Sequence, residues 1–190
     1  MRNPVRKIIV SNEYVGDRIS VLIVGRFRKE KGQLRLLSFI SSNRRKLKSL
    51  GYQFIFIGDG PQLKQAKEYE EDSFINFKGL MTSKDEIYSM GDLVIIPSDW
   101  EGLPLVCLEA LISKTHILSR KYDGIQFLGK YITYFDWDNL LKILSDYSWR
   151  KPDSIIQEGA NHVLHLYGEE NVKDYMLSIY ESTCSRKASK

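Results

Sequence analysis

Short apolar runs recur along the first two thirds of the chain and set the pattern of the fold. Each run is rich in Ile, Val or Phe and is continuous rather than alternating with polar residues, which is typical of strands buried on both faces. The sequence therefore predicts five strands of a parallel sheet, at residues 20–25, 53–58, 74–79, 92–97 and 115–119.

Segments with helical periodicity lie between these runs. Residues 33–49 carry leucines and an isoleucine at spacings that suit one helix face, and a second helix is expected at 61–70. Residues 83–90 open with Ser83 and Glu86 in the capping-box arrangement, which marks a helix start. Strands and helices alternating at this pitch predict βαβ units, and hence an α/β domain with a single Rossmann-like, doubly wound parallel sheet and helices on both faces.

The last third of the chain predicts helices without intervening strands. We expect the Rossmann-like domain to span 20–150 and C-terminal helices to span 151–184, with 185–190 as a disordered tail. His162 and His165 share one face of these helices, but no third metal ligand is evident from the sequence. A surface or interface pair is therefore favoured over a metal site.

The composition is that of an ordinary globular protein, with 43% hydrophobic and 27% charged residues among 190. The net charge of +4 comes from 28 basic residues interspersed with 24 acidic ones, and no dense basic stripe is combined with stacking aromatics, so nucleic acid is not an expected partner. Two distant cysteines and the lack of a bilayer-spanning apolar run predict a cytoplasmic protein. The basic run 42–49 favours a solvated helix face, and a peripheral contact with the inner face of the membrane stays open as the alternative.

Ligands of open parallel sheets bind beyond the carboxyl ends of the strands, and unusual chemistry follows three of the predicted strands. After the first, Gly25 and Arg26 stand in the turn and Lys31 lies near the start of a helix, so two cations could grip two phosphates. A solvated charge cluster is the alternative for such a basic run. After the second, GDGP at 58–61 permits a tight turn but lacks the third glycine of the dinucleotide fingerprint. A plain turn and a ligand contact are both left open there.

The third strand end leads into PSDWEGLPLVCLEAL, residues 97–111. Pro104 suits the first helical position, so Gly102 and Leu103 approach a helix N-terminus, where free N–H groups and the helix dipole favour a phosphate. Cys107 lies inside this run and is expected to be a small core residue rather than a nucleophile.

Two glutamates flank that helix start. Glu101 stands beside it, and Glu109 follows about five residues into the helix. Ionised carboxylates only accept hydrogen bonds, so both glutamates could accept them from the hydroxyls of a ligand that has a sugar, a diphosphate and a ribose in that order. The spacing alone is weak evidence, because with 24 acidic residues it arises often by chance, and a buried or capping glutamate is the alternative.

The stretches VGRFRKEKG, FIGDGPQLKQ, FKG and PSDWEGLPLVCLEAL, with the spacing among them, resemble the donor-binding, C-terminal half of a retaining GT-B-type glycosyltransferase of the group 1 family. The similarity is marked over about residues 20–120 and looser in the ending LYGEENVKDYMLSIYE. It implies a retaining, metal-independent glycosyltransferase without a cofactor, which takes a UDP- or GDP-sugar as donor in cell-surface polysaccharide or glycolipid biosynthesis.

The same resemblance implies a role for each matching position, with Gly25 counted among the substrate-binding residues. Arg26 and Lys31 would hold the donor's diphosphate. Glu101 would contact the transferred sugar, assisted by backbone N–H groups. The remaining roles are the backbone of Gly102 and Leu103 beside the sugar, Glu109 on the ribose hydroxyls, and the backbone near Lys78 against the base.

Three features depart from the family pattern. Trp100 stands where a smaller residue is common, which could narrow the sugar pocket, and KYDGIQFLG (121–129) replaces a glycine-rich turn. No counterpart of the N-terminal half is present, and residues 1–19 read as an interdomain linker and lead-in. We therefore expect an acceptor-binding N-terminal domain outside this chain, with an apolar patch of the last helices packing toward it: Leu164, Tyr167, Tyr175, Met176 and Tyr180.

Three alternatives from other classes remain. The chain could be a nucleotide-sugar-binding subunit that is inactive without a separate partner chain. It could be half of a sugar-nucleotide epimerase, which free nucleotide and epimerised sugar among the products would reveal. A degenerate domain used only for protein contacts is disfavoured, because all four polar positions keep the side chains that a donor needs: Arg26, Lys31, Glu101 and Glu109.

Overall fold

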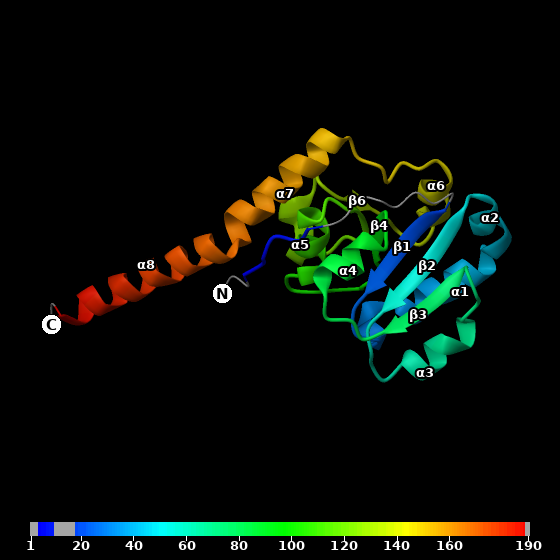
Figure 1. Ribbon diagram of the computed structural model, residues 1–190, viewed down its shortest axis with the longest axis horizontal. Helices are drawn as coiled ribbons and strands as arrows, with labels where there is room; N and C mark the ends of the chain where they lie inside the picture. The colour runs from blue at the N-terminus through cyan, green and yellow to red at the C-terminus, as the bar shows by residue number, and fades with distance from the viewer. Residues whose placement is uncertain (1–3, 10–17, 189–190) are drawn as a thin grey trace.

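A computed structural model describes residues 4–9 and 18–188 of the protein, with side-chain surroundings up to residue 178. Six parallel strands form one sheet in the order β3-β2-β1-β4-β5-β6 (Figure 1). This is the strand order of a doubly wound Rossmann-like sheet, so the predicted fold class is confirmed. The strands are β1 (Ile19–Val24), β2 (Tyr52–Ile57), β3 (Ile75–Gly79), β4 (Leu93–Ile96), β5 (His116–Ser119) and β6 (Thr133–Tyr134).

Five of these strands coincide with the predicted apolar runs, and β6 is the one that the sequence analysis missed. It pairs with β5 over only two residues, Thr133 and Tyr134, both half-buried. A two-residue strand is too short to produce a hydrophobic pattern, so periodicity could not find it.

Helices surround the sheet, and two of the predicted ones are interrupted. The expected helix 33–49 breaks at Asn43, whose side-chain amide donates to the carbonyl of Phe39 at 2.9 Å. The backbone amide of Asn43 donates to the same carbonyl at 3.1 Å, so the side-chain bond adds to the end of α1 without replacing its last backbone bond. The expected helix 61–70 forms a short helix followed by a 3-10 turn. The observed elements here are α1 (Gln33–Ser42), α2 (Arg44–Ser49), α3 (Leu63–Ala66) and the 3-10 turn Lys67–Tyr69.

The two helices nearest the glutamates begin close to where the sequence placed them. Helix α4 (Lys84–Ser89) is capped by Ser83, whose hydroxyl accepts from the amide of Glu86 at 3.3 Å, so the predicted capping residue is confirmed. Helix α5 (Leu105–Ile112) starts one residue later than expected, because Pro104 has an extended backbone and is the N-cap.

The C-terminal third is helical as predicted. It contains α6 (Leu140–Ser145), α7 (Asp153–Tyr167) and α8 (Glu169–Ala188). Helix α7 packs against the body, whereas α8 projects away from it as a rod (Figure 1). Helix α8 continues to Ala188, where a disordered tail from residue 185 was expected, and the side chain of Tyr180 lies outside the described surroundings. Across residues 4–9 and 18–188, no helix combines the length and apolar character needed to cross a bilayer.

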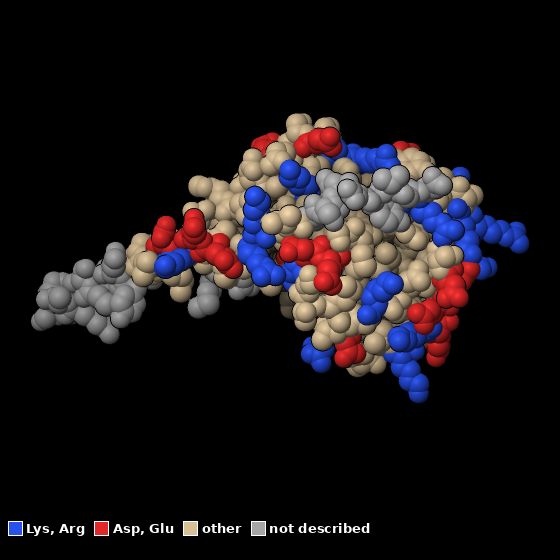
Figure 2. Space-filling view, viewed as in Figure 1, with Lys and Arg blue, Asp and Glu red and all other residues tan. Residues whose placement is uncertain are grey.

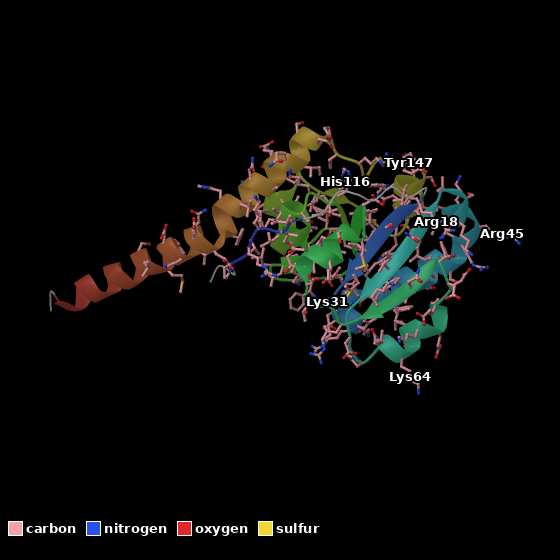
Figure 3. All side chains as sticks on the ribbon, viewed as in Figure 1. Arg18, Lys31, Arg45, Lys64, His116 and Tyr147 are labelled. Atoms are coloured by element: carbon pink, nitrogen blue, oxygen red, sulfur yellow. The ribbon has the colours of Figure 1, made fainter. Side chains whose placement is uncertain are left out.

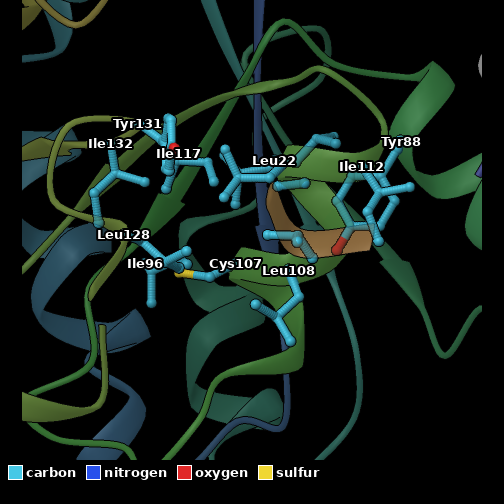
Figure 4. Close-up of a cluster of buried hydrophobic side chains, with 14 of the residues drawn as sticks. Leu22, Tyr88, Ile96, Cys107, Leu108, Ile112, Ile117, Leu128, Tyr131 and Ile132 are labelled. Atoms are coloured by element: carbon cyan, nitrogen blue, oxygen red, sulfur yellow. The ribbon is translucent and has the colours of Figure 1, made fainter. Parts of the chain in front are cut away.

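The core lies on both faces of the sheet. On β1, Leu22 joins one cluster beneath α4, α5 and α7, while Val21 and Ile23 join a second beneath α1, α2, α3 and α6. Figure 4 shows part of the first cluster, in which Cys107 is surrounded by aliphatic side chains. Burial of both strand faces is the physical reason that the strands read as continuous apolar runs.

The segment of residues 4–9 is anchored to the domain rather than free of it. The amide of Val5 donates to the carbonyl of Tyr167 at 2.8 Å, and the amide of Ile9 donates to Asp85 Oδ1 at 2.9 Å. Val5 and Ile8 are buried. This part of the expected linker therefore lies against α4 and the junction of α7 and α8, and the predicted boundaries at 19, 150 and 184 stay predictions.

Candidate functional site

The site lies where the strand order reverses, at the carboxyl ends of β1 and β4. Strands β2 and β3 lie on one side of β1, and β4 lies on the other side. This reversal leaves a crevice between the loop that follows β1 and the loop that follows β4. Residues 25–32 follow β1, and residues 97–104 follow β4. All candidate site residues except Glu109 and Lys78 come from these two loops.

Glycines bring the loop after β2 into backbone contact with the loop after β1. A Cβ on Gly58 would lie 2.1 Å from the carbonyl oxygen of Gly25, and one on Gly60 would lie 2.5 Å from that of Phe27. The amide of Phe27 also donates to the carbonyl of Asp59 at 2.8 Å. The GDGP segment therefore forms a tight junction, which puts Asp59 beside Arg26 at the rim of the site.

A second junction locks the loop after β1 to the loop after β4. A Cβ on Gly32 would meet the carbonyl oxygen of Pro97 at 2.3 Å, and the backbone φ of Gly32 is 70°, a region that favours glycine. The amide of Asp99 donates to the carbonyl of Glu30 at 3.0 Å. Because these contacts fix both loops, the Lys31 side chain is held next to Glu101.

Glu101 has a partner on each oxygen. Lys31 Nζ lies 2.9 Å from Oε2, and the hydroxyl of Ser98 donates to Oε1. The Glu101 side chain is 15% exposed and Ser98 is buried. The carboxylate is thus charge-compensated and oriented, with one partner from the loop after β1 and one from its own loop.

Glu109 is held in a similar way from a different element. Its Oε2 accepts from the hydroxyl of Tyr88 at 2.9 Å and lies 3.1 Å from Lys84 Nζ, and the residue is 8% exposed. Tyr88 and Lys84 both come from α4, whereas Glu109 is the fifth residue of α5. Each candidate glutamate is therefore paired with a different lysine, Glu101 with Lys31 and Glu109 with Lys84.

Arg26 is the candidate cation that stays exposed. Within the part of the chain that the structure describes, no ion pair of Arg26 is found. Its side chain borders a pocket of about 420 Å³ and an adjoining open hollow of about 680 Å³. Asp59 borders both spaces as well, and Lys84 borders the first. The first pocket has an apolar wall formed by Val24, Ile57, Leu80, Met81, Ile87 and Val106.

Helix α5 points its first turn toward the same region. Its N-cap, Pro104, makes no side-chain cap bond, and among the described residues the amides of Leu105 and Val106 have no hydrogen-bond partner, so they are open to a ligand. A Cβ on Gly124 would lie 1.5 Å from the carbonyl oxygen of Gly102, which shows that the 3-10 helix Asp123–Leu128 packs tightly against this loop. Leu103 is half-buried in the first core cluster, and Trp100 is 69% exposed at the edge.

Lys78 lies apart from the other candidates. It is exposed on β3 and does not border the 420 Å³ pocket, whereas Leu80 and Met81, just beyond the strand, do. The predicted contact between the base and the backbone near Lys78 stays a prediction, and the geometry moves it toward the end of that segment.

Other candidate chemistry reduces to structure. Cys107 is fully buried, and burial, followed by the nearby charge of Glu101, raises the pKa of its thiol, as expected of a core residue. Among the residues that can be described, no group of three or more His, Cys, Asp or Glu is placed to hold a metal ion. The basic run 42–49 contains α2, at the end of the sheet where the strands begin, and two of its cations, Arg44 and Lys48, pair with Glu71. Figure 2 shows basic side chains gathered on this side of the molecule.

Sequence reasoning missed the residues that orient the glutamates. Lys84, Tyr88 and Ser98 carried no motif, although the Ser83 cap already put Lys84 and Tyr88 one turn apart on one helix. That they reach Glu109 depends on how α4 packs on α5, which local patterns do not encode.

A doubly wound sheet with paired charges at its β1–β4 crevice defines a Rossmann-like domain with a ligand site at the strand ends. The family model described as "Glycosyl transferases group 1" matches residues 5–128, so the chain belongs to this family. The expected resemblance is thereby confirmed, and the chain matches a C-terminal part of such proteins.

Relatives and solved structures agree with this membership. The GalNAc-α-(1→4)-GalNAc-α-(1→3)-diNAcBac-PP-undecaprenol α-1,4-N-acetyl-D-galactosaminyltransferase of Campylobacter jejuni is 32% identical over 114 residues, covering 58% of this chain and 31% of that protein. The C-terminal domain of the group 1 glycosyltransferase LpcC from Francisella tularensis is 25% identical, with a TM-score of 0.62 over 80% of this chain and 87% of that one. Anabaena HepE in complex with UDP-glucose shares the fold, with 17% identity and a TM-score of 0.71 over 87% of this chain and 49% of that one. The chain spans 48%, 31% and 30% of the lengths of three curated relatives.

Proposed function

We propose that this chain is the donor-binding domain of a retaining glycosyltransferase, and that its substrate at this site is a nucleotide-diphosphate sugar. The observation that carries the proposal is the pairing of Glu101 with Lys31 and of Glu109 with Lys84 around the β1–β4 crevice. Family membership supports a glycosyltransferase, and the shared fold of a protein bound to UDP-glucose supports this class of donor.

The diphosphate would be bound between the loop after β1 and the start of α5. Arg26 offers a planar guanidinium that has no ion pair within residues 4–9 and 18–188, and the start of α5 offers N–H groups and the positive end of a helix dipole. When the glycosidic bond breaks, negative charge grows on the leaving diphosphate. Fixed positive groups stabilise that charge in the transition state, and we propose that they do so here in place of a bound metal ion.

The sugar and the ribose would lie on opposite sides of this diphosphate. Glu101, oriented by Ser98 and Lys31, would accept hydroxyl hydrogens of the transferred sugar. Glu109, four residues beyond the first residue of α5, would accept those of the ribose. The base would then enter the apolar wall at Leu80 and Met81.

We further propose that the acceptor is bound by a second domain outside residues 1–190. The short coverage of the relatives supports this. Transfer needs the acceptor hydroxyl about 3 to 3.5 Å from the anomeric carbon in a site that excludes water. On α8, Tyr175, Met176 and Leu177 are 43 to 48% exposed, which is consistent with a surface that another domain covers.

A thermal-shift panel of UDP-, GDP- and ADP-sugars tests the donor proposal. A ligand at 100 times its dissociation constant stabilises the folded state by about 2.7 kcal/mol, so at least one donor should raise the melting temperature by several degrees. The same donor should give a much smaller shift with an Arg26→Ala/Lys31→Ala variant. If no nucleotide sugar stabilises the protein, the donor proposal is wrong, and sugar transfer by residues 1–190 alone would contradict the need for a second domain.

A further inference from the structure

Helix α4 supplies two hydrogen-bond donors to one oxygen of Glu109. Lys84 and Tyr88 are four residues apart, so both side chains project from the same face of α4 toward α5. Tyr88 Oη lies 2.9 Å and Lys84 Nζ lies 3.1 Å from Oε2 of Glu109. No role in the site follows for either residue from the sequence motifs.

The donors are held rigidly. Tyr88 is 1% exposed and packs in the first core cluster, and burial, followed by the charge of Glu109, raises the pKa of its hydroxyl well above the ordinary value. Tyr88 therefore keeps its proton and donates to the carboxylate. The start of α4 is fixed by the Ser83 cap and by the bond from the Ile9 amide to Asp85. These bonds tie the start of α4 to the segment of residues 4–9.

This arrangement leaves the two carboxylate oxygens unequal. Oε2 takes both donors from α4, and no hydrogen bond to Oε1 is found from any residue that the structure describes. An ionised carboxylate has about four acceptor positions, so Oε1 keeps its full capacity for a ligand. Lys84 borders both the 420 Å³ pocket that Arg26 borders and a neighbouring pocket of about 270 Å³ that Glu109 lines, so it lies between Glu109 and the candidate donor pocket.

We propose that Lys84 and Tyr88 are positioning residues that lock the Glu109 carboxylate so that Oε1 faces the ribose hydroxyls of the nucleotide. The inference rests on the proposed donor function and adds the residues that make the site selective for a ribose. Lys84 acts through Glu109 and does not contact the phosphates. A lysine bound to phosphate would affect every nucleoside diphosphate, whereas a lysine that orients Glu109 affects only ligands with ribose hydroxyls.

The test is a comparison of ligands that differ only in those hydroxyls. Among UDP, GDP and ADP, the one that binds the wild-type chain most tightly is compared with its 2′,3′-dideoxy counterpart by titration calorimetry. A hydrogen bond to a charged group contributes about ten- to a hundredfold in affinity, so the wild type should prefer the ribose form by about that factor. Lys84→Met should reduce the preference to about threefold or less and leave the dideoxy affinity unchanged.

Two further variants separate positioning from loss of folding. Lys84→Arg keeps a cation that can reach Glu109, so it should restore much of the ribose preference, and Tyr88→Phe should remove part of it. Lys64→Met is the matched control, because Lys64 is an exposed lysine on α3 (Figure 3). It should retain the full preference.

Each other result overturns the inference. A full ribose preference in Lys84→Met would show that Lys84 does not orient Glu109. Equal weakening of both ligands by Lys84→Met would show a phosphate contact instead. A wild type that binds both forms equally would leave the donor function standing but refute the ribose contact, and a wild type that binds no nucleoside diphosphate would refute the proposed function as well.

Discussion

The two cations assigned to the diphosphate should not respond alike to removal. Arg26 has no ion pair among the residues described, whereas Lys31 lies 2.9 Å from a carboxylate whose side chain is only 15% exposed. Arg26→Ala therefore removes one charge-assisted contact to phosphate. Lys31→Ala removes such a contact and also leaves Glu101 uncompensated next to an anionic ligand.

The difference can be estimated from charges. Loss of a hydrogen bond to a charged group costs about 1.5 to 3 kcal/mol, or roughly ten- to a hundredfold in affinity, and this is the expectation for Arg26→Ala. A like charge at about 8 Å and an effective dielectric of about 20 adds about 2 kcal/mol. Lys31→Ala should therefore bind a nucleoside diphosphate at least ten times more weakly than Arg26→Ala. The stability of both variants should stay within about 1 kcal/mol of the wild type, because partly exposed ion pairs contribute little.

Calorimetry with UDP or GDP, combined with urea unfolding, measures both effects. Arg45→Ala is the control, because Arg45 is exposed on α2, at the opposite end of the strands from Lys31 (Figure 3). Adding Glu101→Gln to Lys31→Ala removes the uncompensated carboxylate and should restore about tenfold. Equal affinities for Arg26→Ala, Lys31→Ala and the wild type would refute the phosphate assignment, and no recovery in the double variant would refute the charge argument.

Three other predictions follow from the same geometry. Glu101→Gln should leave the affinity for a plain nucleoside diphosphate within about threefold of the wild type and weaken binding of the sugar conjugate, whereas Glu109→Gln should weaken binding of both ligands. Calorimetry with the two ligands checks this. If both variants lose the same affinity for the plain nucleotide, the proposed order of sugar and ribose is wrong. Gly58→Ala should destabilise the fold by about 3 kcal/mol or more, because its Cβ would lie 2.1 Å from the carbonyl oxygen of Gly25 at a φ of 141°, while Gly102→Ala, which meets nothing within 4 Å, should change the urea midpoint little. Burial raises the pKa of Tyr52 from 10.0 to about 12, so the unfolded chain loses this proton at a lower pH than the folded chain does. The free energy of unfolding should therefore fall between pH 10 and 12 by up to about 2 to 3 kcal/mol. Tyr52→Phe should show a shallower alkaline decline, and an unchanged slope would argue against this linkage.

The sheet could be predicted because its strands are covered on both faces. Continuous apolar runs such as the one containing Val21, Leu22 and Ile23 have few alternatives in a parallel α/β domain. The break at Asn43 and the short β6 could not be predicted, since no Gly or Pro marks the first and the second rests on two residues of pairing.

The two glutamates and the basic loop of the candidate site could be predicted from the sequence, but the pairing of each glutamate with a lysine could not. The contact of Lys31 with phosphate stays a prediction, and the fold adds an ion pair with Glu101, because Gly32 packs on Pro97 and ties the two loops together. Lys84 and Glu109 are 25 residues apart on different helices, so their contact is a product of tertiary packing. Spacing reveals which groups follow the strands, and only the fold reveals which of them meet.

A crystal structure of this chain with the nucleotide sugar selected by the thermal-shift panel would show where the donor binds. We predict density for the diphosphate between Arg26 and the first turn of α5, with the ribose on Glu109 and the sugar on Glu101. A nucleotide bound elsewhere on the protein, or one bound in the crevice with neither glutamate in contact, would contradict it.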